Sequence, residues 1–190
     1  MRNIPLVLTV MFALAGCAAQ VGVEVPNDPD GAQGASEPAA GDNHDLFAGE
    51  MPPLMQQAHS RQLDGALLDL DEQRALYDYA LEHDDDARPW LLLARDSMRR
   101  DWQGFALRQY ASAIEADARA AVQRGVLDDL VRIAAYNSAV FEQRNAADLI
   151  VDVYSDDALP AIERALADAE RAGDDAAIAR LTALRTTLEG

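Results

Sequence analysis

The fold of this chain is decided by the stretch RPWLLLARDSMRRDWQGFALRQYASAIEADA, residues 88–118. Apolar residues recur at helical spacing on both sides of a short turn at Trp102, which predicts two consecutive helices. Small residues such as Ala94 and Ala106 allow the two helices to approach closely, and the larger apolar residues then wedge between neighbours. The stretch therefore predicts a pair of antiparallel helices.

Parts of this pattern recur along the chain, which indicates a repeat. Tyr77 and Ala80 return with the same spacing as Tyr110 and Ala113. A further, weaker copy lies within 128–158. The pattern in 88–118 consists of Trp90, Leu93, Ala94, Ala106, Tyr110 and Ala113, and the corresponding positions in 128–158 are Leu130, Ile133, Ala134, Ala146, Ile150 and Val153.

This arrangement resembles the tetratricopeptide (TPR) repeat, which has a bulky opening residue, a Leu–small pair, and then a small, an aromatic and a small residue. The resemblance is good over 88–118 and partial over 53–87 and 128–158. Ser97 and Ala118 depart from it, since the family has an aromatic residue and a proline there. The resemblance implies an all-α, TPR-like α-solenoid of about three or four helix pairs. Another array of helical hairpins is the alternative.

Helices are expected over most of residues 52–190, which we predict to form one helical repeat domain. Acidic residues next to the boundaries favour helix N-termini. Gly125 is expected to end a long helix as its C-cap. The predicted helices are 53–63, 69–83, 88–100, 103–124, 128–142, 145–155, 158–172 and 175–188.

Residues 1–16 have the features of a bacterial secretory signal, with Arg2 followed by an apolar run too short to span a bilayer. Leu14-Ala15-Gly16-Cys17 resembles the lipobox of lipoprotein signal peptides, which implies cleavage before Cys17 and acylation of its thiol. Acyl chains such as palmitate would anchor the protein outside the cytoplasm. Ala18 favours the outer membrane, facing the periplasm, with the cell surface as an alternative. A buried apolar helix and ordinary secretion are the competing interpretations.

Residues 17–51 are rich in Pro, Gly and acidic residues, which predicts a lipidated cysteine followed by a disordered linker. The whole chain has a formal net charge of −17, and all its basic residues are Arg. Such a chain is repelled by phosphate, so nucleic acid is excluded as a partner. Anionic lipid headgroups also repel it, which leaves the acyl chains as its attachment to the membrane.

No constellation of residues predicts catalysis, a metal site or a cofactor. His44, His59 and His83 are scattered and lack metal-binding spacing. Neither a GxSxG nucleophile elbow nor a glycine-rich phosphate loop is present in the sequence. We therefore expect no enzyme, no catalytic residue and no cofactor.

One face of the helix over 88–100 combines arginines with apolar residues, pointing away from Trp90, Leu93 and Ala94. By the TPR resemblance this face lines a concave groove that binds a protein or peptide. Arg presents a rigid fork that suits carboxylates, and apolar neighbours add contact area. Alternatively, these arginines pair with surface Asp and Glu and contribute little. The predicted groove residues are Arg88, Leu91, Arg95, Met98, Arg99 and Arg132.

Together these observations predict a membrane-anchored lipoprotein on the periplasmic side that acts as a protein-binding scaffold or adaptor in envelope complex assembly. The alternative is a structural or self-associating envelope lipoprotein with no dedicated groove. The sequence identifies neither the partner nor the oligomeric state.

Overall fold

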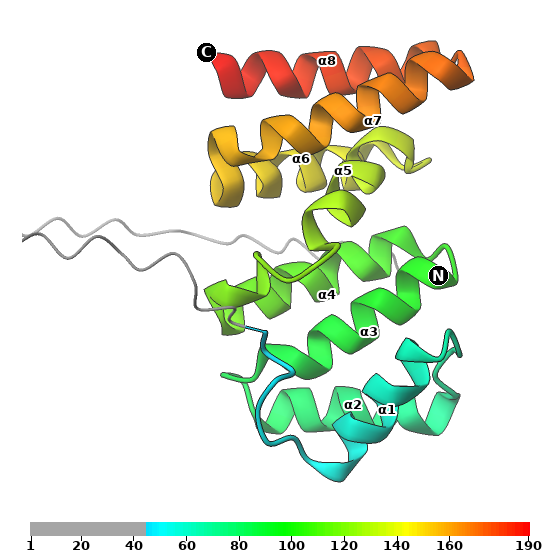
Figure 1. Ribbon diagram of the computed structural model, residues 1–190, viewed down its shortest axis with the longest axis vertical. Helices are drawn as coiled ribbons and strands as arrows, with labels where there is room; N and C mark the ends of the chain where they lie inside the picture. Colours follow the sequence, from blue (N-terminus) through cyan, green and yellow to red (C-terminus); the bar gives the residue numbers. More distant parts are fainter. Residues whose placement is uncertain (1–44) are drawn as a thin grey trace, which may run out of the picture. The chain divides into compact units, whose positions relative to one another are not determined.

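Helices make up nearly all the regular structure of residues 45–190, the part of the chain that the computed structural model describes (Figure 1). No strand occurs among these residues, so the all-α prediction is confirmed. The α-helices are α1 (Pro53–Leu63), α2 (Leu70–Glu82), α3 (Ala87–Arg99), α4 (Gln103–Ala116), α5 (Val126–Tyr136), α6 (Val140–Tyr154), α7 (Leu159–Ala172) and α8 (Asp175–Glu189), with short 3-10 helices η1 (Ala118–Ala120) and η2 (Ser155–Ala158).

Acidic side chains begin several helices, as expected from their positions. The Asp69 carboxylate accepts a hydrogen bond from the Glu72 backbone N–H, and the Glu72 carboxylate accepts one from the Asp69 N–H, both at 2.9 Å. This reciprocal pair is a capping box. Asp86 caps α3 and Asp174 caps α8 without a reciprocal bond. Each carboxylate accepts one hydrogen bond from a backbone N–H at 3.0 Å. Local chemistry thus sets where these helices start.

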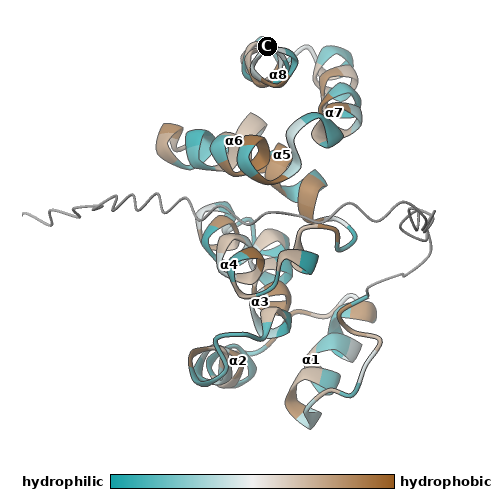
Figure 2. Ribbon diagram, turned by 90° about the vertical axis from the view of Figure 1, so that its left-hand side faces the viewer, coloured by the Kyte–Doolittle hydropathy of each residue, from teal (hydrophilic) through white to brown (hydrophobic). Residues whose placement is uncertain are grey.

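The helices follow one another in chain order along the described unit, and the most extensive contacts join α3 to α4, α5 to α6, and α7 to α8 (Figure 1). Most of them carry both hydrophobic and hydrophilic residues (Figure 2). The hydrophobic residues meet in a core whose largest fully buried members include Tyr110, Leu91, Leu130, Ile133, Ile150, Ile162 and Leu181. The patterns in 88–118 and 128–158 supply much of this core, and of their positions only Trp90 and Val153 are not buried.

The prediction of one long helix over 103–124 is wrong. The helix α4 ends at Ala116, and Asp117 adopts extended backbone while its carboxylate accepts the Arg119 N–H at 2.9 Å, which starts η1. An Asp side chain that bonds to nearby backbone competes with the helical ladder. Gly125 has φ +87° and lies before α5 as its N-cap, not after α4 as a C-cap. Glycine takes this left-handed conformation without a Cβ penalty.

The boundary expected at residue 142 is also wrong, because α5 ends at Tyr136 and α6 begins at Val140. Between them, the Asn137 side-chain oxygen accepts the Ala139 N–H at 2.8 Å. This local bond again replaces helical hydrogen bonding. The connection between α5 and α6 is therefore short, and α6 starts earlier than predicted.

The predicted linker extends to residue 51, but residues 45–51 contact the helices in the described structure. Phe47 is only 7% exposed, and Leu46 and Met51 pack against the core. The predicted signal peptide, Cys17 and the first part of the linker lie outside the described residues. Within residues 45–190, no helix is both long and apolar enough to cross a membrane.

Candidate functional site

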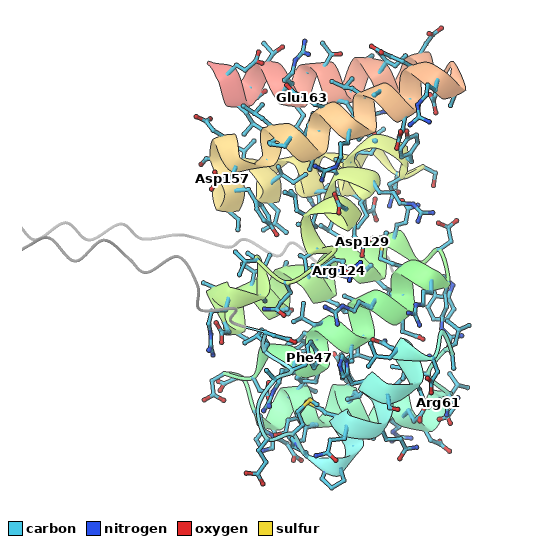
Figure 3. All side chains as sticks on the ribbon, in the orientation of Figure 1. Phe47, Arg61, Arg124, Asp129, Asp157 and Glu163 are labelled. Atoms are coloured by element: carbon cyan, nitrogen blue, oxygen red, sulfur yellow. The ribbon has the colours of Figure 1, made fainter. Side chains whose placement is uncertain are left out.

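A groove beside α3 gathers positive charge from separate parts of the chain. It encloses about 720 Å³ and is formed by the segment before α1, by α1, by α3 and by the segment that leads into α5. We call it the basic groove. Its lining residues are Asp45, Phe47, His59, Gln62, Leu63, Arg95, Arg99, Val122, Gln123 and Arg124. Figure 3 labels Phe47 and Arg124, which come from distant parts of the sequence and both line this groove.

Arg95 projects from α3 into the basic groove. Its guanidinium carbon lies 5.1 Å from the centroid of the Phe47 ring, within the range of a cation–π contact. Burial lowers the pKa of Arg95, and this effect is opposed by Tyr110, Asp129 and Asp45. Arginine stays protonated in proteins. The groove therefore contains a half-buried positive charge that an anionic group would stabilise.

Arg99 lies one helical turn after Arg95 and is fixed by backbone carbonyls. One of its terminal nitrogens donates to the Gln62 carbonyl at 2.8 Å and the other to the Ala66 carbonyl at 3.2 Å. Gln62 is in the last turn of α1, where carbonyls lack intrahelical partners, and Ala66 lies just after the helix. The contacts hold the guanidinium at the edge of the groove without neutralising its charge.

Arg124 completes the positive lining from the opposite segment, directly before Gly125. In the part of the chain that the structure describes, neither Arg95, Arg99 nor Arg124 forms an ion pair with a carboxylate. Exposed apolar side chains lie beside them, since Leu63 is 74% and Val122 is 75% exposed. The groove thus offers guanidinium forks next to apolar surface.

Leu91 and Met98, predicted to line the groove, belong to the core instead. Leu91 is fully buried and Met98 is 7% exposed. The reason is that α3 contacts α1 and α2 as well as α4, so more than one of its faces is covered. The prediction for these two residues is therefore wrong.

Arg88 lies outside the basic groove and is neutralised. Its guanidinium forms a bidentate interaction with Asp86, at 2.8 Å from Nε and 2.7 Å from Nη2, and Nη1 donates to the Glu50 carbonyl at 2.9 Å. The hydrogen bond to Asp86 raises the pKa of Arg88. Arg132 lies on α5 at a different cavity, together with Asp128 and Arg164. Of the arginines expected to line one groove, the structure brings only Arg95 and Arg99 together.

Buried Tyr110 and half-buried Asp129 form a polar pair near Arg95. The Tyr110 hydroxyl of α4 donates a hydrogen bond to the Asp129 carboxylate in the first turn of α5. Burial raises the pKa of both groups, and the hydrogen bond and the charges of Arg132 and Arg95 partly counteract this for Asp129. The sequence places Tyr110 in the apolar repeat pattern and Asp129 near a predicted helix start, and neither local signal indicates their contact across helices.

The histidines within the described residues have local roles. The His59 ring stacks on Phe47 at 4.5 Å between centroids, and burial lowers the pKa of His59. His83 lies 3.0 Å from the Tyr79 carbonyl oxygen at the end of α2. His44 lies outside the described residues. Over residues 45–190, no group of three or more His, Cys, Asp or Glu side chains has a geometry that could hold a metal ion.

Comparison with known proteins adds no assignment for this site. No protein-family model, no curated protein and no solved structure matches the chain.

Proposed function

We propose that this chain is a TPR-like scaffold lipoprotein, anchored to the membrane through Cys17, that holds a partner protein in the basic groove during assembly of an envelope complex. The solenoid interpretation is supported by two copies of the same apolar pattern, which supply the core of α3–α4 and of α5–α6. Stacked helix pairs of this kind expose extended surfaces suited to binding peptides.

The observation that carries the binding proposal is the unpaired charge of Arg95, Arg99 and Arg124. The chain has 33 acidic residues and only 16 basic ones, yet these three arginines have no carboxylate partner among the described residues. Arg recognises carboxylates through parallel N–H···O bonds. A partner segment that brings carboxylates and apolar side chains fits this lining.

The double variant Arg99→Glu/Arg124→Glu is expected to abolish capture of the partner. Both side chains reach the groove, and reversing their charge repels an acidic segment. The measurement is pull-down from envelope extracts of the source bacterium, with captured proteins identified by mass spectrometry. Arg95 is left intact because it packs close to the core pair of Tyr110 and Asp129.

A matched control is the double variant Arg164→Glu/Arg171→Glu on α7. It makes the same change in net charge at exposed ion pairs outside the groove. We expect this control to capture the partner as the unmodified chain does. Equal loss with both variants would show that total charge, not the basic groove, governs binding.

A second function, self-association as a structural lipoprotein, is favoured by one surface. Trp102, Phe105, Tyr136 and Phe141 are each at least 40% exposed, and the first three line a cavity of about 430 Å³ between the α3–α4 and α5–α6 connections. Exposed aromatic groups of this kind mark interaction surfaces. Capture that is unchanged in Arg99→Glu/Arg124→Glu would favour this alternative.

The anchor is tested separately with Cys17→Ser. Serine cannot form the thioether that carries the acyl chains, so metabolic labelling with radioactive palmitate is expected to disappear and the precursor to accumulate. The protein should then leave the membrane fraction, because anchoring requires the acyl chains. Continued labelling of the serine variant would refute the assignment of Cys17.

A further inference from the structure

Part of the basic groove is already filled by the chain itself. A few residues before α1, the chain forms a turn in which the Ala48 N–H donates to the Asp45 carbonyl at 3.0 Å. The Asp45 carboxylate accepts the Phe47 N–H at 2.9 Å. At the other end of the turn, the Glu50 carbonyl accepts a hydrogen bond from Arg88 at 2.9 Å. We call residues 45–50 the groove segment.

Phe47 is the anchor of the groove segment. Its ring lies parallel to the His59 ring, with an interplanar angle of 5° and 4.5 Å between centroids, and Arg95 lies over it at 5.1 Å. The side chain is 93% hidden from solvent although it belongs to a segment without helix or strand. Aromatic burial and cation–π contact both stabilise this placement.

Asp45 adds a negative charge next to the same positive groups. It lines the basic groove together with Arg95 and His59. Burial lowers the pKa of His59, and the charge of Asp45 acts in the opposite direction. The groove segment thus presents an aromatic ring and a carboxylate two residues apart to a site lined by arginine and histidine.

We propose that the groove segment is an internal substitute for the partner, and that the partner peptide presents an aromatic side chain beside a carboxylate. The inference rests on the proposed function and names the chemistry that the groove recognises. Binding then proceeds by exchange: the partner's aromatic ring replaces Phe47 on His59 and Arg95. Because buried aromatic area is lost and gained in similar amounts, the exchange is governed by the partner's further contacts.

Those further contacts are available in the unfilled part of the groove. Arg99 and Arg124 lie there with the exposed side chains of Leu63 and Val122. A tethered segment competes at a high effective concentration, so only a partner that also engages this part displaces it. The groove segment therefore acts as a specificity filter against short acidic peptides.

The test uses the full chain and a fluorescein-labelled peptide, Asp-Asn-His-Asp-Leu-Phe-Ala-Gly-Glu, which copies residues 42–50. Fluorescence anisotropy measures its binding to the unmodified chain and to Phe47→Ala. We expect Phe47→Ala to bind the peptide at least tenfold more tightly, because the internal competitor has lost its anchor. Adding Arg95→Gln to this variant should remove the gain.

Two controls keep the result specific. Phe105→Ala removes an exposed aromatic side chain outside the groove and should bind as weakly as the unmodified chain. A peptide with alanine in place of phenylalanine should not bind Phe47→Ala. If Arg95→Gln disturbs the circular dichroism spectrum, His59→Ala provides the same test, since it removes the ring on which Phe47 stacks.

Equal affinity of Phe47→Ala and the unmodified chain would overturn the inference, and so would equal binding of the alanine peptide. This outcome is independent of the capture experiment, which uses envelope proteins and the charge of Arg99 and Arg124. One outcome is that Phe47→Ala binds the peptide tightly while Arg99→Glu/Arg124→Glu captures the partner normally. This outcome would support the groove segment as an internal competitor and reject the scaffold function. Unchanged peptide binding by Phe47→Ala together with loss of capture in Arg99→Glu/Arg124→Glu would support the scaffold function and reject the internal competitor.

Discussion

Leu91→Ala is expected to lower the free energy of unfolding by about 3–4 kcal/mol, in the middle of the range for leucine truncation in protein cores. Leu91 has no exposed surface and lies in the main hydrophobic cluster on α3. Truncation removes buried apolar atoms and leaves a cavity that close-packed neighbours fill only in part. Urea denaturation followed by circular dichroism measures the change, with the slope expected to stay constant.

Leu63→Ala is the matched control, because it removes the same atoms from a leucine that is 74% exposed. Its effect is expected within about 0.5 kcal/mol of zero. Comparison of the two variants shows whether the Leu91 side chain lies in the core or lines the groove. A cost below about 1 kcal/mol for Leu91→Ala would place this side chain on an accessible surface, as the sequence alone suggested.

The helices themselves could be predicted from the sequence because apolar periodicity and acidic caps are local signals. These local signals fail over 103–124. Apolar residues continue there, but the Asp117 side chain accepts a hydrogen bond from the Arg119 N–H and the helix ends. Helical periodicity does not report such a side-chain bond. The left-handed conformation of Gly125 is equally compatible with the end of one helix and the start of the next.

The error at Leu91 has a tertiary cause. Leu91, Leu92 and Leu93 are all at most 5% exposed, so α3 is buried on more than one face. A repeat pattern identifies the face that packs within a pair, and the opposite face was assumed to be open. In this chain, α1 and the groove segment cover part of that opposite face.

The sequence could predict only those residues of the candidate site that lie together on one helix. Arg95 and Arg99 are four residues apart on α3, so they share a face by geometry. Arg124 and Phe47 reach the same groove from segments whose positions depend on the folded chain. One signal was available: Phe47 is the lone Phe, Tyr or Trp in residues 18–51, and an aromatic side chain in an acidic linker is a candidate anchor.

Asp96→Ala is expected to lower the free energy of unfolding by about 3 kcal/mol, as is typical when one partner of a buried ion pair is removed. Asp96 is 2% exposed and connects α3 to the start of α2. Its carboxylate accepts hydrogen bonds from the Leu68 N–H at 2.8 Å, from Gln73 Nε2 at 3.1 Å and from Arg100 Nε at 2.7 Å. Alanine leaves a buried backbone N–H and a guanidinium without this acceptor, and each unsatisfied group costs free energy.

Asp78→Ala provides the comparison that isolates burial. Asp78 also has an Arg one helical turn away, but its 3.9 Å interaction with Arg74 is exposed, so its loss should cost about 0–1 kcal/mol. Urea denaturation measures both variants, and amide hydrogen exchange at Leu68 should accelerate only in Asp96→Ala. Equal, small costs for the two variants would show that Asp96 acts as an ordinary surface carboxylate. A large cost with unchanged exchange at Leu68 would assign the stability to the side-chain contacts with Gln73 and Arg100, because the hydrogen bond from the Leu68 N–H would then contribute nothing.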